Sequence, residues 1–279
     1  MTAIVQVGVW ARLSPALRRL TQDNPGPFTG TGTNTFLIGA DPLWILDPGP
    51  DHDGHFAQIV DEVAAARVLG ILCSQSHPDH WPMVPRLAGY FSAPALGFAS
   101  LGGYEPDELI QVGAVLDRGG PVLQAIHTPG HARDHLCFLR TAEGVLFSAD
   151  HVMGWSTSVI APPGGNLNDY MSSLDKLQEL SFATMHPAHG PPIEDPLARI
   201  IELREHRLMR TREALAALEA GLRRIPEMVE RIYVGLDERL VIPASWSLLA
   251  HLEALVEEGK ASRTAAGEPL KAEYELTSP

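Results

Sequence analysis

Cysteine is scarce in this sequence of 279 residues: there are two, Cys73 and Cys137, and both lie in apolar runs. Two such cysteines do not make the disulfide framework of a small secreted protein. They are typical of a reducing compartment, so we expect a cytoplasmic protein. Long hydrophobic runs are also missing. A membrane-spanning helix needs about 18 uncharged apolar residues in succession, so the sequence argues against an integral membrane protein and predicts no membrane partner.

Basic residues are the second shortage. The chain has 21 Lys and Arg against 34 Asp and Glu, a formal net charge of −13 at pH 7. Most of this imbalance, a net charge of −11, falls in residues 1–198. Nucleic-acid binding draws on surplus Lys and Arg that neutralise phosphates, so the charge disfavours a nucleic-acid partner. A bound divalent cation would offset part of the charge, which directs attention to the 12 histidines.

The first part of the chain, residues 1–196, consists of short apolar segments separated by glycine and proline. Residues 55–67 place apolar side chains at i, i+3, i+4 and i+7, which predicts an amphipathic helix, and residues 170–180 predict another. Strands are expected at 35–39, 43–46, 68–73, 122–126, 136–139 and 145–147. Several of these strands end in polar clusters, which is how an α/β protein gathers a site from distant parts of its chain.

The second part, residues 197–279, has a different pattern. Helices are predicted at 197–222, 225–232 and 245–258, and a weak hairpin follows at 261–276. Three helices and a hairpin of this size are typical of a winged-helix module, so we expect a domain boundary at residue 196. The candidate recognition helix, 245–258, carries three acidic residues and no Lys or Arg. Reading of DNA in the major groove is therefore disfavoured, and a role in contacting a partner or covering the site is favoured.

A cluster of metal-ligand residue types follows the apolar segment that ends at residue 73. His77, Asp79 and His80 lie within four residues, and imidazole and carboxylate are the ligands of a hydrolytic Zn²⁺ or a harder ion. One such cluster alone is compatible with a histidine-rich surface loop. Further ligand types occur at His127–His131, Asp150 and His189. All lie at strand ends, which favours a metal site over the surface loop.

These segments resemble the four metal motifs of the metallo-β-lactamase superfamily, and they occur in the same order: Ser74–His80, His127–His131, Ser148–Asp150 and Pro187–Gly190. The likeness extends upstream to residues 24–27 and 32–38 and downstream through 197–279, so it covers nearly the whole chain. It is greatest to the β-lactamase-like proteins that carry a C-terminal winged helix. The resemblance implies an α/β (α+β) fold, a four-layer αβ/βα sandwich with metals at one edge, followed by the winged-helix module.

The resemblance also implies two metal positions, the first formed by residue 75, His77 and His131, the second by Asp79, His80 and His189, with Asp150 shared between them. The family has histidine at the first of these positions, and this chain has Gln75. An amide oxygen is a weak neutral ligand compared with imidazole. We therefore expect one tightly bound Zn²⁺ at the second position and leave a second ion open. Iron and manganese stay open too, because histidine–carboxylate sets accept several ions.

The leading hypothesis is a hydrolase that acts on a small-molecule ester, thioester or lactone. A bound ion lowers the pKa of water from ~15.7 towards ~7 and so presents hydroxide to the substrate. Asp79 is expected to be both ligand and catalytic residue, because it can orient that hydroxide. Three more histidines either form hydrogen bonds that hold the ligands or are structural residues that are buried or satisfy a turn: His127, His135 and His151.

Two other functions stay open. One mitochondrial branch of the resembled family cleaves single-stranded RNA, but such an enzyme needs a basic or aromatic track leading to its metals. Residues 1–198 offer eight arginines and one lysine. A non-catalytic binding protein is suggested by Gln75 alone, and the other six ligand positions argue against it. The sequence leaves open whether the chain forms a homodimer. Asn34 and Thr35 either line the site or form part of a turn at the start of a strand.

Overall fold

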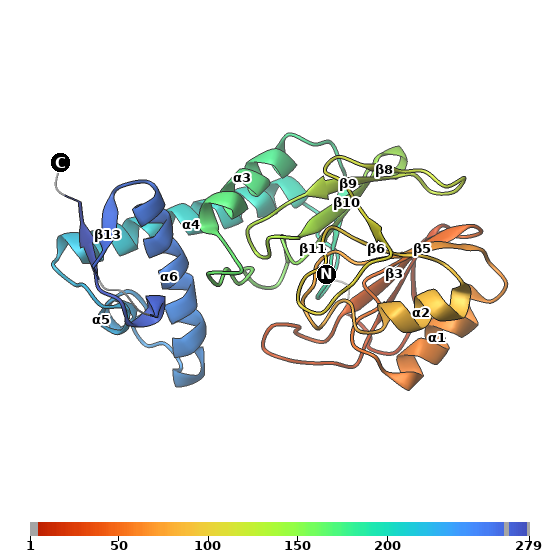
Figure 1. Ribbon diagram of the computed structural model, residues 1–279, viewed down its shortest axis with the longest axis horizontal. Coiled ribbons are helices and arrows are strands. Elements are labelled where there is room, and N and C mark those ends of the chain that lie inside the picture. The colour runs from red at the N-terminus through yellow and green to blue at the C-terminus, as the bar shows by residue number, and fades with distance from the viewer. Residues whose placement is uncertain (1–4, 265–267, 278–279) are drawn as a thin grey trace. The chain divides into compact units, whose positions relative to one another are not determined.

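The computed structural model describes residues 5–264 and 268–277 (Figure 1). The chain forms two units. Unit 1 comprises Met1–Thr128, Asp134–Ser158 and Glu179–Arg199, and unit 2 comprises Pro129–Arg133, Val159–Gln178 and Ile200–Pro279. The division into domains at residue 196 stays a prediction.

Unit 1 contains a seven-stranded sheet whose strands follow one another in chain order. The first four strands pair antiparallel and the last four pair parallel, with β4 common to both sets. The strands expected at 35–39 and 43–46 are found as the antiparallel pair β3–β4. The strands are β1 (Ala11–Ser14), β2 (Leu17–Thr21), β3 (Asn34–Gly39), β4 (Leu43–Leu46), β5 (Val68–Leu72), β6 (Ala95–Gly97) and β7 (Glu108–Leu109).

Two helices, α1 (Asp53–Val63) and α2 (Val84–Phe91), cover one face of this sheet (Figure 1). Alternate strand residues such as Leu37 point to this face and share a core with both helices. The helix predicted at 55–67 begins earlier and ends earlier than expected. The imidazole of His52 caps its start, and Ala64 ends it in a positive-φ conformation while donating its N–H to the Val60 carbonyl.

The second sheet of unit 1 has five strands in the order β12-β11-β10-β9-β8. Its β11–β12 pair is parallel and the other pairs are antiparallel. The strands are β8 (Val115–Leu116), β9 (Leu123–His127), β10 (Leu136–Arg140), β11 (Val145–Ala149) and β12 (Thr184–Pro187); a 3₁₀ turn, η1 (Thr141–Glu143), joins β10 to β11. The expected strands at 122–126, 136–139 and 145–147 are therefore present, with bounds shifted by one or two residues.

The two sheets pack face to face around one apolar core. Phe36 of β3 and Phe147 of β11 meet edge to face, with ring centroids 5.2 Å apart. Each fully buried phenylalanine side chain contributes roughly 1.5–3 kcal/mol relative to exposure. This core fixes the ends of the strands from both sheets, and the polar residues that follow β4, β5, β11 and β12 depend on that placement.

Unit 2 is mainly helical. The predicted helix at 225–232 is found with those bounds, whereas the helix predicted at 245–258 begins at Val241. Pro243 lies in its first turn, where a missing N–H costs no helical hydrogen bond. The elements are α3 (Leu167–Gln178), α4 (Pro196–Glu219, which starts in unit 1), α5 (Ile225–Ile232), η2 (Glu238–Leu240), α6 (Val241–Glu257), β13 (Ala261–Arg263), η3 (Pro269–Lys271) and β14 (Tyr274–Leu276).

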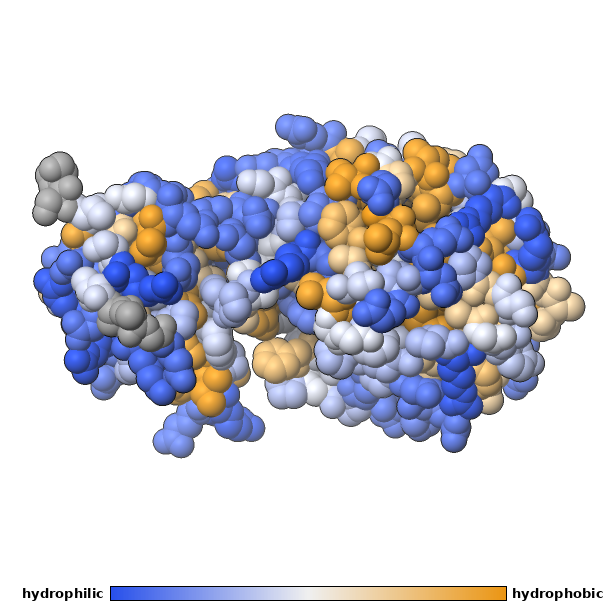
Figure 2. All heavy atoms as spheres, in the orientation of Figure 1, coloured by the Kyte–Doolittle hydropathy of each residue, from blue (hydrophilic) through white to orange (hydrophobic). Residues whose placement is uncertain are grey.

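Within unit 2, the C-terminal helices and the β13–β14 hairpin share a core that includes Leu218, Met228, Leu252 and Tyr274. Among the described residues, one stretch, Glu238–Glu257, is long and apolar enough to cross a membrane by length and composition. It contains α6, whose Leu252 lies in this core, and a core helix passes the same test. Most of the surface in view is hydrophilic, with apolar side chains gathered over β8 and β9 (Figure 2), where Val115 is exposed.

Candidate metal centre

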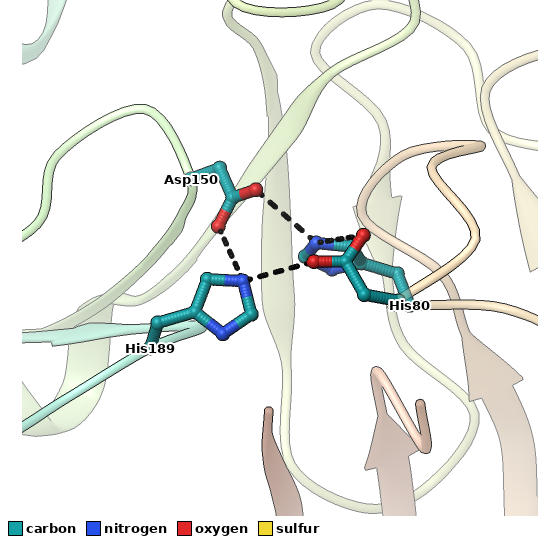
Figure 3. Close-up of side chains that lie close together, drawn as sticks. His80, Asp150 and His189 are labelled. Atoms are coloured by element: carbon teal, nitrogen blue, oxygen red, sulfur yellow. Dashed lines mark hydrogen bonds and ion pairs between the residues drawn. The ribbon is translucent and has the colours of Figure 1, made fainter. Parts of the chain in front are cut away.

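Asp79, His80, Asp150 and His189 lie together at one edge of unit 1. One ligand atom from each lies within 4.8 Å of the others. Asp79 and His80 belong to the loop that follows β5, Asp150 comes directly after β11, and His189 follows β12. Because β11 and β12 are parallel neighbours, their carboxyl ends bring Asp150 and His189 to the same edge. Figure 3 shows His80, Asp150 and His189 pointing towards one another.

The two imidazoles present their Nε2 atoms to the two carboxylates. His189 Nε2 lies 3.2 Å from Asp79 Oδ2 and 3.2 Å from Asp150 Oδ1. His80 Nε2 lies 3.2 Å from Asp150 Oδ2. Two carboxylates this close repel each other unless positive charge lies between them. The donor set of two imidazole nitrogens and two carboxylates therefore fits a divalent cation.

The electrostatics of the cluster show its excess of negative charge. Burial by itself lowers the pKa of His80, but the carboxylates of Asp150, Asp79 and Asp47 outweigh burial and raise it well above its usual value. Burial likewise raises the pKa of Asp79, yet His80 and His189 bring it down to about 2. Asp79 is thus a carboxylate at neutral pH. A bound dication would neutralise the charge that these shifts reveal.

The outer nitrogen of each imidazole has an acceptor of its own. His80 Nδ1 donates to Asp47 Oδ2 across 3.1 Å, and His189 Nδ1 donates to the Gly32 carbonyl across 3.1 Å. In the neutral form of each imidazole, which is the form that binds a metal, a proton held on Nδ1 leaves the Nε2 lone pair directed into the cluster. Metal-binding histidines characteristically have such partners, which fix the tautomer and the ring orientation.

Asp47 is a site residue that the sequence reasoning missed. Its Oδ1 accepts from the Ser74 N–H (2.8 Å) and its Oδ2 from the Ser74 hydroxyl (2.6 Å), so the carboxylate that holds His80 is itself fixed. Asp47 has φ of 49°, a conformation that aspartate tolerates better than most residues. The available signal was the Asp-Pro-Gly run directly after β4, another polar cluster at a strand end.

The segment that enters β3 holds two of the ligand loops. The Thr33 hydroxyl donates to the Asp79 carbonyl across 3.0 Å. The Asn34 amide donates to the carbonyls of Pro187 (3.0 Å) and Gly190 (2.9 Å), on either side of His189. Asn34 is fully buried, so it positions the His189 loop from beneath and does not line the site mouth.

Thr35, which like Asn34 was expected either to line the site or to form part of a turn, is also fully buried. Its hydroxyl donates to the Asp47 carbonyl across 3.1 Å and lies 2.8 Å from His55 Nε2 of helix α1. Thr35 therefore ties the end of β4 to α1, and like Asn34 it supports the ligand loops from inside the fold.

Gln75 lies inside the cluster. Its Nε2 is 2.7 Å from Asp150 Oδ2 and 2.9 Å from His80 Nε2, and only the amide orientation that points NH₂ inwards satisfies both acceptors. The Oε1 atom is buried and has no hydrogen-bond partner in the described part of the chain. The amide N–H groups thus use the lone pairs that a cation would use at His80 and Asp150.

The two remaining predicted ligands lie in different units. His77 is half-buried in the same loop as Asp79 and His80, and its carbonyl accepts from the His80 N–H across 3.0 Å. His131 belongs to unit 2, where its Nδ1 donates to the Val159 carbonyl across 2.5 Å. That bond leaves Nε2 as the ligand atom. The grouping of His77 with His131 at a first metal position stays a prediction.

Of the three supporting histidines, His135 makes the expected contact. Its Nε2 accepts from the backbone N–H of Asp150 across 3.2 Å, while its Nδ1 pairs with the Thr128 hydroxyl at 2.8 Å. His127 instead stacks on Phe98, with ring centroids 4.0 Å apart. His151 is fully buried, with its ring centroid 5.6 Å from that of His135.

Comparison with known proteins agrees with this fold. Residues 28–189 match the family model of the metallo-beta-lactamase superfamily, and residues 225–268 match that of the beta-lactamase associated winged helix domain. The chain belongs to the metallo-β-lactamase superfamily. The predicted family and fold class are thereby confirmed, and the protein is an enzyme, a hydrolase of this superfamily.

Individual relatives are similar to this chain over most of its length. The lactamase-like protein adaB of Aspergillus niger is 32% identical over 249 residues, covering 82% of this chain and 76% of the relative. The atrochrysone carboxyl ACP thioesterase of Aspergillus chevalieri is 36% identical over 214 residues, covering 74% and 67%. A crystal structure of a β-lactamase domain protein from Burkholderia ambifaria matches with a TM-score of 0.82 at 22% identity, over 99% of this chain and 96% of that one. This last likeness concerns the fold.

Proposed function

We propose that the protein hydrolyses a small-molecule thioester with a divalent ion held by Asp79, His80, Asp150 and His189. The observation that carries the proposal is the convergence of two imidazole Nε2 atoms and two carboxylates within 4.8 Å. Thioester is preferred to ester or lactone because a relative that is 36% identical is named as an acyl-carrier thioesterase.

When bound, a divalent ion supplies a water activated near neutral pH and polarises the attacked carbonyl. The chain's own residues would orient that chemistry. The Asp79 side chain is the most exposed of the four ligands, at 27% against 8% for Asp150, 1% for His189 and 0% for His80. Its carboxylate, with a pKa of about 2, accepts a hydrogen bond from the attacking water at any ordinary pH. Water then adds to the acyl carbon, the C–S bond breaks, and the leaving thiolate takes the proton that the water gives up.

The number of ions follows from Gln75. It stands where the family has histidine, and its amide contacts Asp150 and His80, two residues of the candidate centre. An amide oxygen is a weaker ligand than imidazole. We propose one tightly held ion, bound by the four clustered residues, and occupancy of a first position only at high metal concentration. Zn²⁺ suits this donor set, and iron or manganese are the other ions to test.

A substrate panel tests the proposal. Purified protein is loaded with Zn²⁺, Fe²⁺ or Mn²⁺ and offered hexanoyl-N-acetylcysteamine, the matching oxygen ester, a six-membered lactone and a single-stranded RNA oligonucleotide. We expect thiol release from the thioester at a rate at least tenfold above that for the ester and lactone, and no cleavage of RNA. Efficient RNA cleavage without thioester hydrolysis would assign the protein to the endoribonuclease alternative instead.

A further inference from the structure

The loop between Asp150 and Ser158 presents an indole to solvent beside the candidate centre. Trp155, in the middle of this loop, has 42% of its surface exposed. A half-exposed tryptophan leaves apolar ring area in contact with water, and tryptophan is enriched at binding interfaces. Whether Trp155 contributes to the candidate centre therefore depends on which residues its ring contacts.

The ring lies against two glycines, one of which follows a ligand directly. A β-carbon placed on Gly190, the residue after His189, would lie 2.6 Å from Trp155 Cδ1. A β-carbon on Gly30 would lie 3.1 Å from Trp155 Cζ2. Only the absence of side chains at these two positions lets the indole approach so closely. The ring therefore touches the backbone of the His189 loop.

The loop that carries Trp155 is held on both sides of the ring. Arg199 donates through Nε to the Met153 carbonyl (2.8 Å) and through Nη2 to the Ser156 carbonyl (2.7 Å). The Ser158 hydroxyl donates to the Asp150 carbonyl across 2.5 Å. An exposed indole fixed in this way can bind a ligand without first losing conformational freedom.

A second exposed aromatic residue lies on the segment against which the indole packs. Phe28 is 56% exposed and belongs to the turn that Gly26 and Gly30 close with a pair of backbone hydrogen bonds, 3.2 and 2.9 Å long. The Thr29 hydroxyl fastens this turn by donating to the Asn24 carbonyl across 2.7 Å. Phe28 and Trp155 thus belong to two fixed segments that meet at Gly30.

We propose that Trp155, together with Phe28, forms an apolar surface that binds the acyl group of the substrate. The substrate class is then a thioester of a bulky apolar or aromatic acid, not of acetate. This inference rests on the proposed thioester hydrolysis and adds to it the part of the substrate that the chain selects. Trp155 acts on binding of the acyl group and takes no part in bond making.

Equilibrium binding of product acids tests the surface independently of turnover. Isothermal titration calorimetry of the metal-loaded protein compares 2-naphthoate with acetate. We expect Trp155→Ala to weaken naphthoate binding about tenfold, which corresponds to about 1.4 kcal/mol, and to leave acetate binding unchanged. Trp155→Phe should recover part of the loss. Tyr90→Ala removes an aromatic side chain that is 59% exposed on helix α2 and should change neither affinity.

Kinetics on thioesters of N-acetylcysteamine give the second measurement. With the naphthoyl thioester, Trp155→Ala should raise KM about tenfold with little change in kcat, and with the acetyl thioester it should change neither. Unaltered naphthoate affinity in Trp155→Ala would overturn the proposed surface, even if thioesters are hydrolysed. Trp155-dependent binding of naphthoate with no hydrolysis of any thioester would leave the surface standing and overturn the proposed function.

Discussion

The amide of Gln75 donates to the carboxylate of Asp150 across 2.7 Å. In a cluster otherwise composed of imidazoles and carboxylates, this neutral side chain holds a bridging position without adding charge. It also contacts His80 Nε2 at 2.9 Å, so one amide nitrogen reaches both an imidazole and a carboxylate of the centre. The same contacts make Gln75 the residue on which metal stoichiometry depends.

Replacing Gln75 by histidine should raise the number of bound ions from near one per chain towards two, because imidazole is a far better ligand than an amide. Elemental analysis after dialysis against dilute chelator measures this. Gln111→His adds a histidine at an exposed position outside the cluster and should leave the stoichiometry unchanged. If the unaltered protein already retains two ions after such dialysis, the one-ion proposal fails.

Asp47→Asn should weaken Zn²⁺ affinity roughly 10- to 100-fold, the usual effect of losing the partner of a ligating histidine. Asparagine keeps the size of the side chain but removes the negative charge that the His80 N–H faces at 3.1 Å. Competition with a chromogenic chelator measures the affinity. Asp51→Asn, which alters an exposed ion pair with Arg86, is the control. Equal affinities in the two variants would show that Asp47 does not support His80.

The lowered pKa of a buried histidine outside the metal cluster predicts that the protein loses stability in acid. Burial, with a smaller effect of Arg19, lowers the pKa of His186 to about 4. A histidine with a lowered pKa favours the folded state when neutral, so its contribution is complete above pH ~6.5 and is lost as the pH falls towards 4. A shift of this size corresponds to roughly 3 kcal/mol.

His186→Phe tests this source of acid sensitivity, because His186 lies against Phe36 and Phe147, with centroids 5.8 and 5.9 Å away. Urea unfolding of the metal-free protein at pH 7 and pH 4.5 should show a smaller loss of unfolding free energy in the variant than in the unaltered chain. Gln111→Phe, at an exposed position outside the cluster, should keep the full loss. Identical pH profiles for all three proteins would contradict the assignment.

How much of the site was predictable depends on how local its determinants are. Asp79, His80, Asp150 and His189 lie in polar segments that follow apolar ones, so their positions at strand ends could be read from the sequence. The role of Asp47 could not, because it depends on β4 lying beside β5, which brings Asp47 within 2.8 Å of the Ser74 N–H. Pairing between segments far apart in sequence leaves no local pattern.

The same distinction applies to the fold. The apolar runs at 35–39 and 43–46 predicted the strands β3 and β4, and the helical pattern of residues 225–232 predicted α5 with its bounds. The starts of α1 and α6 were misplaced for different reasons: the His52 imidazole caps α1 at an earlier residue, and Pro243 is tolerated in the first turn of α6. Asn34 illustrates the limit most clearly, since its partners Pro187 and Gly190 lie about 150 residues away along the chain.

The most direct test of the account removes a single ligand and follows metal content and hydrolysis together. His189→Ala takes away an Nε2 that lies 3.2 Å from both carboxylates, and His52→Ala serves as the matched control at an exposed histidine. Zn²⁺ content and thiol release from hexanoyl-N-acetylcysteamine are measured on the same folded preparations. We predict that His189→Ala retains less than a tenth of the bound metal and of the activity, while His52→Ala retains both. Full metal content and full turnover in His189→Ala would contradict the assignment of this cluster as the catalytic metal centre.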